Sequence, residues 1–484
     1  MTSLAASGRL RGPVIILVVA GVAAGLAAAT MVVPFELVIA GTIAVAGALT
    51  VVASPQAGLV AVAVFTVLRI PEVATEFHGA PSLFLPLVVL IALGLLLHRA
   101  DAAGATWGGV TAAIVVAAFV VAAAVSLLAV PDAVDAVGTL RGIAEDGSVA
   151  VLAGLLLRGT ASLRRLVWAI VIAGGAVGAV ATLQFALGAF DSSFGGFAQW
   201  AVQNIVGSTD DVRISGPVGD PNYFAQWMVM IIPLAADRSS DETGRGLRIL
   251  AAGSALAMAA ATVLTFSRGG VLALAVVGAF LLARSPRPMR TVAALAVAAV
   301  VIVPLTPGRY LDRLGALGDV GAVEAGIDPS VRARTAEMTA AVAMFSADPL
   351  TGVGYGTFAI RYTDAARDLG IDLRATPREA HNLFLQFAAE MGLVGLLLLA
   401  GIGVAVVGCI RRGRRHFRRI SDLRGDGIGY AVAASLAGYL VTSVFLHLDF
   451  ARLVWLIVGI GLALPRVAVV EDADREAATM AVTP

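Results

Sequence analysis

The sequence contains no lysine, only one cysteine and few charged residues of any kind. Of its 484 residues, 14% are charged and 6% are aromatic, and all 34 basic residues are arginine. A lone Cys409 cannot form a disulfide within the chain or a thiolate cluster, which argues against redox and zinc chemistry. The net charge of +1 gives no electrostatic basis for binding nucleic acid. We therefore expect no metal, no cofactor and no nucleic-acid partner.

Apolar residues dominate what remains. They make up 59% of the chain, and the mean hydropathy is +0.91, which is too high for a soluble protein of this length. The composition predicts an all-α integral membrane protein, a polytopic bundle of about 12 to 14 spans. The apolar runs lie at roughly 13–33, 35–53, 57–70, 82–98, 107–130, 148–158, 163–190, 216–236, 249–266, 270–283, 291–306, 383–410, 428–447 and 452–470.

Three of these runs are shorter than a membrane span, which needs ~20 apolar residues. They lie at 57–70, 148–158 and 270–283. Such short runs are typical of broken or half-inserted helices as well as of complete spans, and the sequence leaves the two open.

The arginines predict the orientation of the chain in its membrane. The densest basic cluster, RRGRRHFRR at 411–419, belongs on the cytoplasmic side, because short cytoplasmic loops retain positive charge. Propagating from it places both termini in the cytoplasm. It also divides the chain into N-terminal transmembrane helices (1–306), an extracytoplasmic loop with short helices (307–380), C-terminal transmembrane helices (381–470) and a cytoplasmic tail (471–484).

The 307–380 loop is long enough to be functional. Asp328 and Pro329 are typical of a helix start, and the apolar pattern after them ends before the Asp348-Pro349 pair. Gly352 and Gly354 then lie in GVGYGTF, which permits a close-packed backbone. This glycine cluster is equally typical of a simple turn and of a phosphate-binding loop.

His381 follows the loop and opens the next span. Pro377 and Glu379 predict a helix start, so that His381 falls in the first turn, where the helix dipole disfavours a charged imidazolium. A neutral imidazole at the membrane surface is suited to removing a proton. The alternative is an interfacial histidine that hydrogen-bonds the loop.

A polar stripe continues down the same helix. Steps of four from Asn382 reach Gln386 and Glu390 within an otherwise apolar run. Polar groups at membrane depth are costly unless they face the interior of the bundle, so this face is expected to point inward. For Glu390, a structural hydrogen bond to a neighbouring element is favoured over a catalytic role.

Two arginines are expected on the same side of the membrane as His381. Arg268 lies in TFSRGG and Arg213 in DDVRISGPVGDPNY. Each alone is typical of an anchor at the lipid headgroups, but together they suggest a phosphate-binding pair beside a general base. Asp220 and Asn222 fit a role in orienting these groups and also fit an ordinary turn at a helix start.

These motifs together resemble the O-antigen ligase and O-antigen polymerase superfamily over roughly residues 205–410. The signature HN-x-x-L-Q-x-x-x-E-x-G-x-x-G, which starts at His381, is the most specific part, and the order of the motifs matches as well. The resemblance rests on R-x-x-G followed by PN (Arg213, Gly216, Pro221, Asn222), TFSRGG, an R-x-x-x-M helix leading to DPLTGVGYGTF (Arg334, Pro349, Gly352, Gly354) and AHNLFLQFAAEMGLVG.

The resemblance implies a many-spanning bundle that transfers a glycan from a polyprenyl-pyrophosphate carrier to an acceptor hydroxyl on a glycan, lipid or protein, without metal and with inversion. Surface polysaccharide is the implied product, and no motif distinguishes a ligase from a polymerase. Arg213 and Arg268 would bind the pyrophosphate, and His381 would activate the acceptor. Supporting roles are expected for Asn222, Arg334, Asn382, Gln386, Glu390, Gly352 and Gly354.

A multi-span transporter or flippase of lipid-linked sugars is the alternative. It would explain many spans, broken helices and an acidic residue inside the membrane. The chain shows no internal repeat, and its polar groups gather at one membrane face rather than at the midplane, both of which favour the transferase.

Overall fold

A computed structural model of the chain describes residues 35–98, 106–128, 135–200, 202–206, 209–302, 329–371, 378–447 and 451–482. These ranges contain 16 α-helices, which confirms the all-α polytopic membrane fold. The predicted first span at 13–33, the loop segment 307–328 with Asp328, and Pro377 lie outside the described residues.

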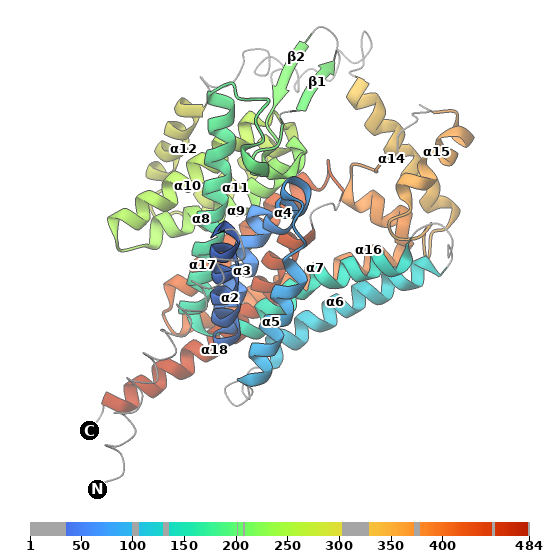
Figure 1. The fold of residues 1–484 in the computed structure, drawn as a ribbon. Coiled ribbons are helices and arrows are strands. Elements are labelled where there is room, and N and C mark those ends of the chain that lie inside the picture. Colours follow the sequence, from blue (N-terminus) through green and yellow to red (C-terminus); the bar gives the residue numbers. More distant parts are fainter. Residues whose placement is uncertain are drawn as a thin grey trace.

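α18 extends away from the other helices toward the C-terminus (Figure 1). It continues to Val482, past the predicted end of the last span at 470. The elements are α2 (Phe35–Ala53), α3 (Pro55–Leu68), α4 (Ile70–His78), α5 (Phe84–Leu97), α6 (Thr106–Leu127), α7 (Ala136–Leu156), α8 (Gly159–Ala186), β1 (Val202–Val206), β2 (Thr209–Arg213), α9 (Pro221–Asp241), α10 (Arg245–Leu264), α11 (Arg268–Arg284), α12 (Pro288–Ile302), α14 (Pro329–Ala347), α15 (Phe358–Leu369), α16 (Leu383–Arg419), α17 (Leu423–Thr442) and α18 (Ala451–Val482).

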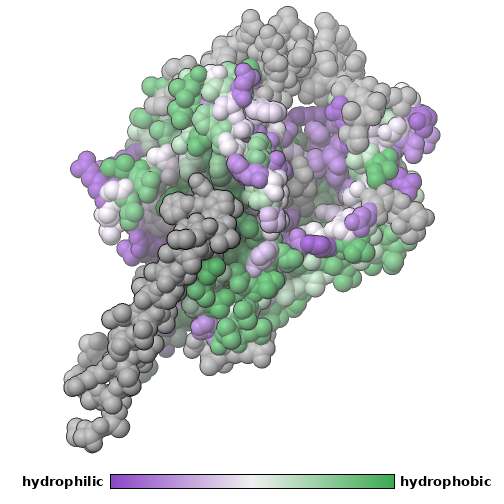
Figure 2. All heavy atoms as spheres, in the orientation of Figure 1, coloured by the Kyte–Doolittle hydropathy of each residue, from purple (hydrophilic) through white to green (hydrophobic). Residues whose placement is uncertain are grey.

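Fewer helices are long and apolar enough to cross a membrane than the 12 to 14 spans predicted. Within the described ranges five meet both conditions, in α6, α8, α10, α16 and α18, or six with the bent pair α3 and α4. The apolar stretches in α2, α5 and α12 are shorter, and α9 and α17 include polar or charged residues in their end turns. Hydrophobic residues cover α6 on the surface, whereas hydrophilic residues gather toward α14 and α15 (Figure 2).

The three short apolar runs have different outcomes. The run at 57–70 lies in α3 and α4, which meet at 53° across Arg69, a residue in the left-handed conformation, as expected of a broken or re-entrant span. The run at 148–158 covers the second half of α7, a longer helix of 21 residues that ends at Leu156, and the two residues after it. The run at 270–283 lies within α11, which has 17 residues.

The structure contains one β-hairpin that the all-helical prediction did not include. β1 and β2 form an antiparallel hairpin in which Val202 pairs with Arg213 and Val206 with Thr209. The hairpin ends at Arg213, so it fixes the backbone of that arginine just before α9.

The helices of the 307–380 loop form a small core of their own. α14 begins at Pro329 and ends at Ala347. This confirms, over the described residues, the helix predicted between the two Asp-Pro pairs. Met344 of α14 packs with Phe358 and Tyr362 of α15 and with Ala389 of α16. Figure 1 shows α14 and α15 beside the start of α16. The loop helices are therefore attached to the helix that carries the polar stripe.

α16 is broken at Gly392, where φ is 60° and ψ is −150°. The segment after α14 pairs with the break like a short strand. The N–H groups of Val353 and Gly354 donate to the carbonyls of Ala389 and Glu390, each at 2.9 Å, and Leu393 N–H donates to the carbonyl of Pro349 at 2.8 Å. These bonds satisfy backbone groups that a break inside an apolar helix would otherwise leave unpaired.

We expect Gly392→Ala to destabilise the protein, because only glycine readily adopts this backbone conformation and an added Cβ would lie 2.4 Å from the Leu350 carbonyl group. The free energy of unfolding should fall by about 2 kcal/mol or more. Gly401→Ala, farther along α16 with no atom within 4 Å of the new methyl group, is the matched control. Thermal unfolding of both variants in detergent measures the difference, and equal stability would contradict a strained break.

Candidate active site

The start of α16 differs from the sequence prediction. Asn382, not a residue before His381, is the N-cap: its Oδ1 accepts from Leu385 N–H at 3.0 Å, and the helix begins at Leu383. His381 therefore precedes the helix and has a left-handed backbone with φ of 48°. The prediction that it lies in the first turn is wrong, because the Asn382 side chain competes successfully for the orphan N–H groups of that turn.

The surroundings of His381 keep its imidazole neutral. Burial lowers the pKa of His381, and the positive charge of Arg334 on α14 lowers it further. Nδ1 lies 3.2 Å from the backbone carbonyl of Glu379 and 3.8 Å from a carboxylate oxygen of Glu337. The Glu379 contact favours the tautomer that donates from Nδ1, so Nε2 is the nitrogen able to accept a proton.

His447 is a site residue that the sequence prediction missed. Its ring centroid lies 5.9 Å from that of His381, and the Tyr223 hydroxyl lies 2.5 Å from its Nδ1. Burial lowers the pKa of His447 to about 3, and the neighbouring His381 contributes in the same direction. The available signal was its place as the last residue of the predicted span at 428–447, at the membrane face expected for His381.

Glu337, on α14, was also missed. It is 2% exposed, and its carboxylate approaches both His381 and Arg378, whose Nη1 lies 3.7 Å away. A buried carboxylate beside an imidazole is well placed to stabilise the charged form of the ring. Its spacing of three residues from Arg334 on the same helix was the signal in the sequence.

Arg213 ties the start of α9 to the turn before α11. Its Nε–H donates to the Thr265 carbonyl at 2.7 Å, and its Nη2 donates to Asn222 Oδ1 at 2.9 Å. Asp220 caps α9 by accepting from the N–H groups of Asn222 and Tyr223. Both roles considered for this turn are therefore present: Asp220 starts the helix, and Asn222 orients the arginine.

Arg268 is the first residue of α11 and is exposed. The N-cap Ser267 accepts from Gly270 N–H, and Phe266 before it has a left-handed φ of 51°. This sharp turn directs the chain from α10 into α11, with Arg213 bonded to Thr265 at its beginning. The structure thus brings the two arginines of the sequence prediction to one turn.

The loop after α17 connects this turn to the start of α16. Asn382 Nδ2 donates to the Val444 carbonyl at 3.1 Å. A Cβ added to Gly269 would lie 3.1 Å from the neighbouring Phe445 ring, so Arg268 sits on a turn packed against the same loop. His447 ends the described part of this loop. The loop after α17 therefore contacts both the segment that carries His381 and the turn that carries Arg268.

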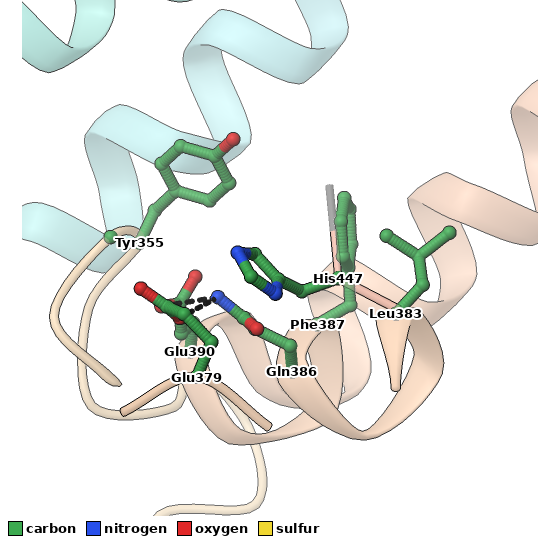
Figure 3. A pocket seen from close by; sticks show the side chains of 8 residues that line it. Tyr355, Glu379, Leu383, Gln386, Phe387, Glu390 and His447 are labelled. Carbon is green, nitrogen blue, oxygen red and sulfur yellow. Dashed lines mark hydrogen bonds between the residues drawn. The ribbon is translucent and has the colours of Figure 1, made fainter. Parts of the chain in front are cut away.

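The predicted polar stripe leads into a cavity of about 150 Å³ (Figure 3). Gln386 donates to Glu379 at 2.6 Å and to Glu390 at 3.3 Å, and Figure 3 shows its amide nitrogen directed toward both carboxyl groups. Glu390 also accepts from Phe358 N–H at 3.1 Å, which is the structural bond favoured for it. The lining residues are Tyr355, Gly356, Glu379, Leu383, Gln386, Phe387, Glu390 and His447.

The two glycines of GVGYG have a structural explanation. A Cβ at Gly352 would lie 2.4 Å from the backbone of Glu390, and Gly354 N–H donates to the Glu390 carbonyl. The close-packed backbone that the sequence permits is present at both positions. This packing positions Tyr355, the residue after Gly354, at the cavity.

Comparison with known proteins identifies one matching family. A family model described as O-antigen ligase matches residues 253–400, a segment that holds Arg268, Arg334, His381, Gln386 and Glu390. None of the curated proteins compared with this chain matches it. The 253–400 match supports membership of the chain in the O-antigen ligase family.

Proposed function

We propose that this O-antigen ligase-like membrane protein transfers a glycan from a polyprenyl-pyrophosphate carrier to an acceptor hydroxyl. His381 acts as the general base, and Arg213 and Arg268 bind the pyrophosphate. The observation that carries the proposal is the placement of a neutral histidine and two arginines around one loop, the one after α17.

The histidine is arranged for proton removal. With Nδ1–H donating to the Glu379 carbonyl, Nε2 accepts the proton of the acceptor hydroxyl as its oxygen attacks the anomeric carbon. The bond from that carbon to the pyrophosphate oxygen breaks on the opposite face, which inverts the configuration. The resulting imidazolium is stabilised by the buried carboxylate of Glu337 at 3.8 Å.

The arginines stabilise the pyrophosphate as it leaves. A pyrophosphate is already a good leaving group, so the protein must mainly neutralise the negative charge that it gains. Guanidinium groups do so with forked hydrogen bonds, and two of them supply the positive charge that a metal ion provides in other enzymes. Arg213 is pre-oriented by Asn222 and Thr265, which lowers the entropy lost on binding.

The two ends of α16 support an active site on the extracytoplasmic face of the inner membrane, with both termini in the cytoplasm. The histidine precedes this helix and the arginine cluster lies at its end, and the part of α16 after the break at Gly392 is by itself long enough to cross a bilayer core of ~30 Å. At the arginine end, Asp426 pairs with Arg284, Arg414 and Arg418. The positive-inside rule assigns that end to the cytoplasm.

The acceptor decides between two versions of the reaction. A ligase attaches finished chains to a lipid, protein or glycan, whereas a polymerase joins carrier-linked repeat units. Undecaprenyl pyrophosphate is the carrier expected in both versions. The geometry of His381 and the arginines serves either one, because both use a hydroxyl acceptor and a pyrophosphate leaving group.

We expect a strain that lacks this gene to lose its surface polysaccharide and to regain it with the native chain but not with His381→Ala, because the base is missing. Accumulation of single repeat units on the carrier would identify a polymerase, and accumulation of full-length unattached chains a ligase. Polysaccharide length and carrier-linked intermediates are read from the same cells. Exposed His78 of α4, changed to alanine, is the control. Full complementation by His381→Ala would refute the catalytic assignment and favour a flippase.

Arg268→Ala and Arg213→Ala should each weaken donor binding by about tenfold or more, because each removes a charge-assisted contact to the pyrophosphate. Turnover should fall as well, since the same charge stabilises the leaving group. Binding of undecaprenyl pyrophosphate to purified protein measures the first effect. Arg361→Ala, which removes an exposed arginine of α15, should bind like the native chain. Native affinity in both site variants would remove the arginines from the proposed role.

Arg334→Gln should shift the acidic limb of the pH–rate profile to higher pH. Burial and the Arg334 charge both lower the pKa of His381, so the native base stays neutral and active as the pH falls toward that lowered value. Without the charge, the pKa rises and protonation inactivates the base at a higher pH. Rates of transfer across pH measure the limb, with Arg361→Ala as control; a downward shift or an unchanged limb would contradict the electrostatic coupling.

A further inference from the structure

We propose that the cavity beside His381 is the acceptor subsite and that it holds one sugar ring of the acceptor through its hydroxyl groups. The inference rests on the proposed function, which requires an acceptor hydroxyl at His381 but names no residues that hold the rest of the acceptor. The cavity is lined by residues of α16, the GVGYG segment and the loop after α17.

The polar lining suits a polyhydroxylated ligand. Glu379 and Glu390 offer carboxyl groups that can form hydrogen bonds with hydroxyl groups. Gln386 contributes an amide that already bridges the two carboxyl groups, and Tyr355 lines the same cavity. Sugars need acceptors and donors at several neighbouring oxygens, and these four side chains provide both.

The charges of the lining residues favour different substrates on the two sides of the histidines. None of the described residues that line the cavity is an arginine, and the carboxyl group of Glu379 opposes the entry of a pyrophosphate. His447 lines the cavity and also contacts Tyr223, which follows the asparagine bonded to Arg213. The anionic donor and the uncharged acceptor are thus directed to different sides of the histidines.

The size and the apolar walls fit one ring. A cavity of about 150 Å³ is of the size that encloses a single six-membered ring. Leu383 and Phe387 form part of the wall, and Phe387 stacks on Phe119 at 5.8 Å, which fixes its orientation. Such a surface accommodates the C–H face of a sugar while the polar side chains bind its edge.

The cavity is also close enough to the proposed base. Glu379 contributes its side chain to the lining and its backbone carbonyl to His381 Nδ1 at 3.2 Å. The His447 ring, also in the lining, is centred 5.9 Å from the His381 ring. A ring bound here has its other hydroxyls held while one reaches toward His381, which makes the lining residues determinants of which hydroxyl reacts.

Binding of simple glycosides to the purified full chain tests the inference. The probes are the methyl glycosides of glucose, galactose, mannose, rhamnose and N-acetylglucosamine, followed by saturation-transfer NMR in detergent. We expect at least one to bind saturably and inorganic pyrophosphate not to displace it. No binding by any probe, or displacement by pyrophosphate, would overturn the separate acceptor subsite.

Two variants locate the site. Glu379→Ala should weaken glycoside binding by about tenfold or more, because it removes a charged hydrogen-bond acceptor, and Gln386→Ala should also weaken it. Asp364→Ala, an exposed carboxylate of α15, is the matched control and should bind normally. Thermal unfolding and undecaprenyl pyrophosphate binding check that the variants are folded; unchanged glycoside affinity in Glu379→Ala and Gln386→Ala would place the ligand elsewhere.

A transfer assay with carrier-linked donor separates this inference from the proposed function. Glu379→Ala should raise the KM for the acceptor about tenfold and leave the affinity for the donor unchanged. Glycoside binding that depends on Glu379, without any transfer by the native chain, would refute the transferase and retain the sugar site. Transfer with an unaltered acceptor KM in Glu379→Ala would retain the transferase and refute the subsite.

Discussion

The hydrogen bonds between the glycine-rich segment and the broken helix α16 are the constraint on which the site depends. A helix interrupted at Gly392 exposes backbone donors and acceptors in an apolar setting, where each unpaired group costs free energy. Val353 and Gly354 donate to one side of the break, and Leu393 donates to the Pro349 carbonyl on the other. Pairing these groups also attaches α14 and α15 to the start of α16, which brings Glu337 to His381.

The same attachment organises the electrostatics. Positive groups lie at the start of α9 and α11, where Arg213 bonds to the turn before Arg268. Carboxyl groups lie on the cavity side, where Gln386 joins Glu379 to Glu390. The half-buried imidazoles of His381 and His447 lie beside both regions. A reaction that pairs an anionic leaving group with an uncharged nucleophile uses such a division, because each substrate meets the charge that suits it.

Local sequence signals predicted much of this arrangement. The apolar runs predicted a helical membrane protein, and the Asp-Pro pairs predicted where α14 ends and where its described part begins. The four-residue spacing of Asn382, Gln386 and Glu390 predicted one polar helix face, and on that face Gln386 donates to Glu390. Helix starts were less certain: the helix predicted to include His381 begins two residues later, because the Asn382 side chain caps it.

The sequence by itself determined the class of protein, the helical content and the chemical types available to the site, because hydropathy and short-range spacing depend on neighbouring residues alone. Tertiary structure decided which of those groups meet. His447 lies next to His381, and Glu337 next to the same ring, only because α17 and α14 pack against the start of α16. The role of Gly352 was likewise decided by a helix distant in the chain, whose backbone occupies the space that a side chain would need.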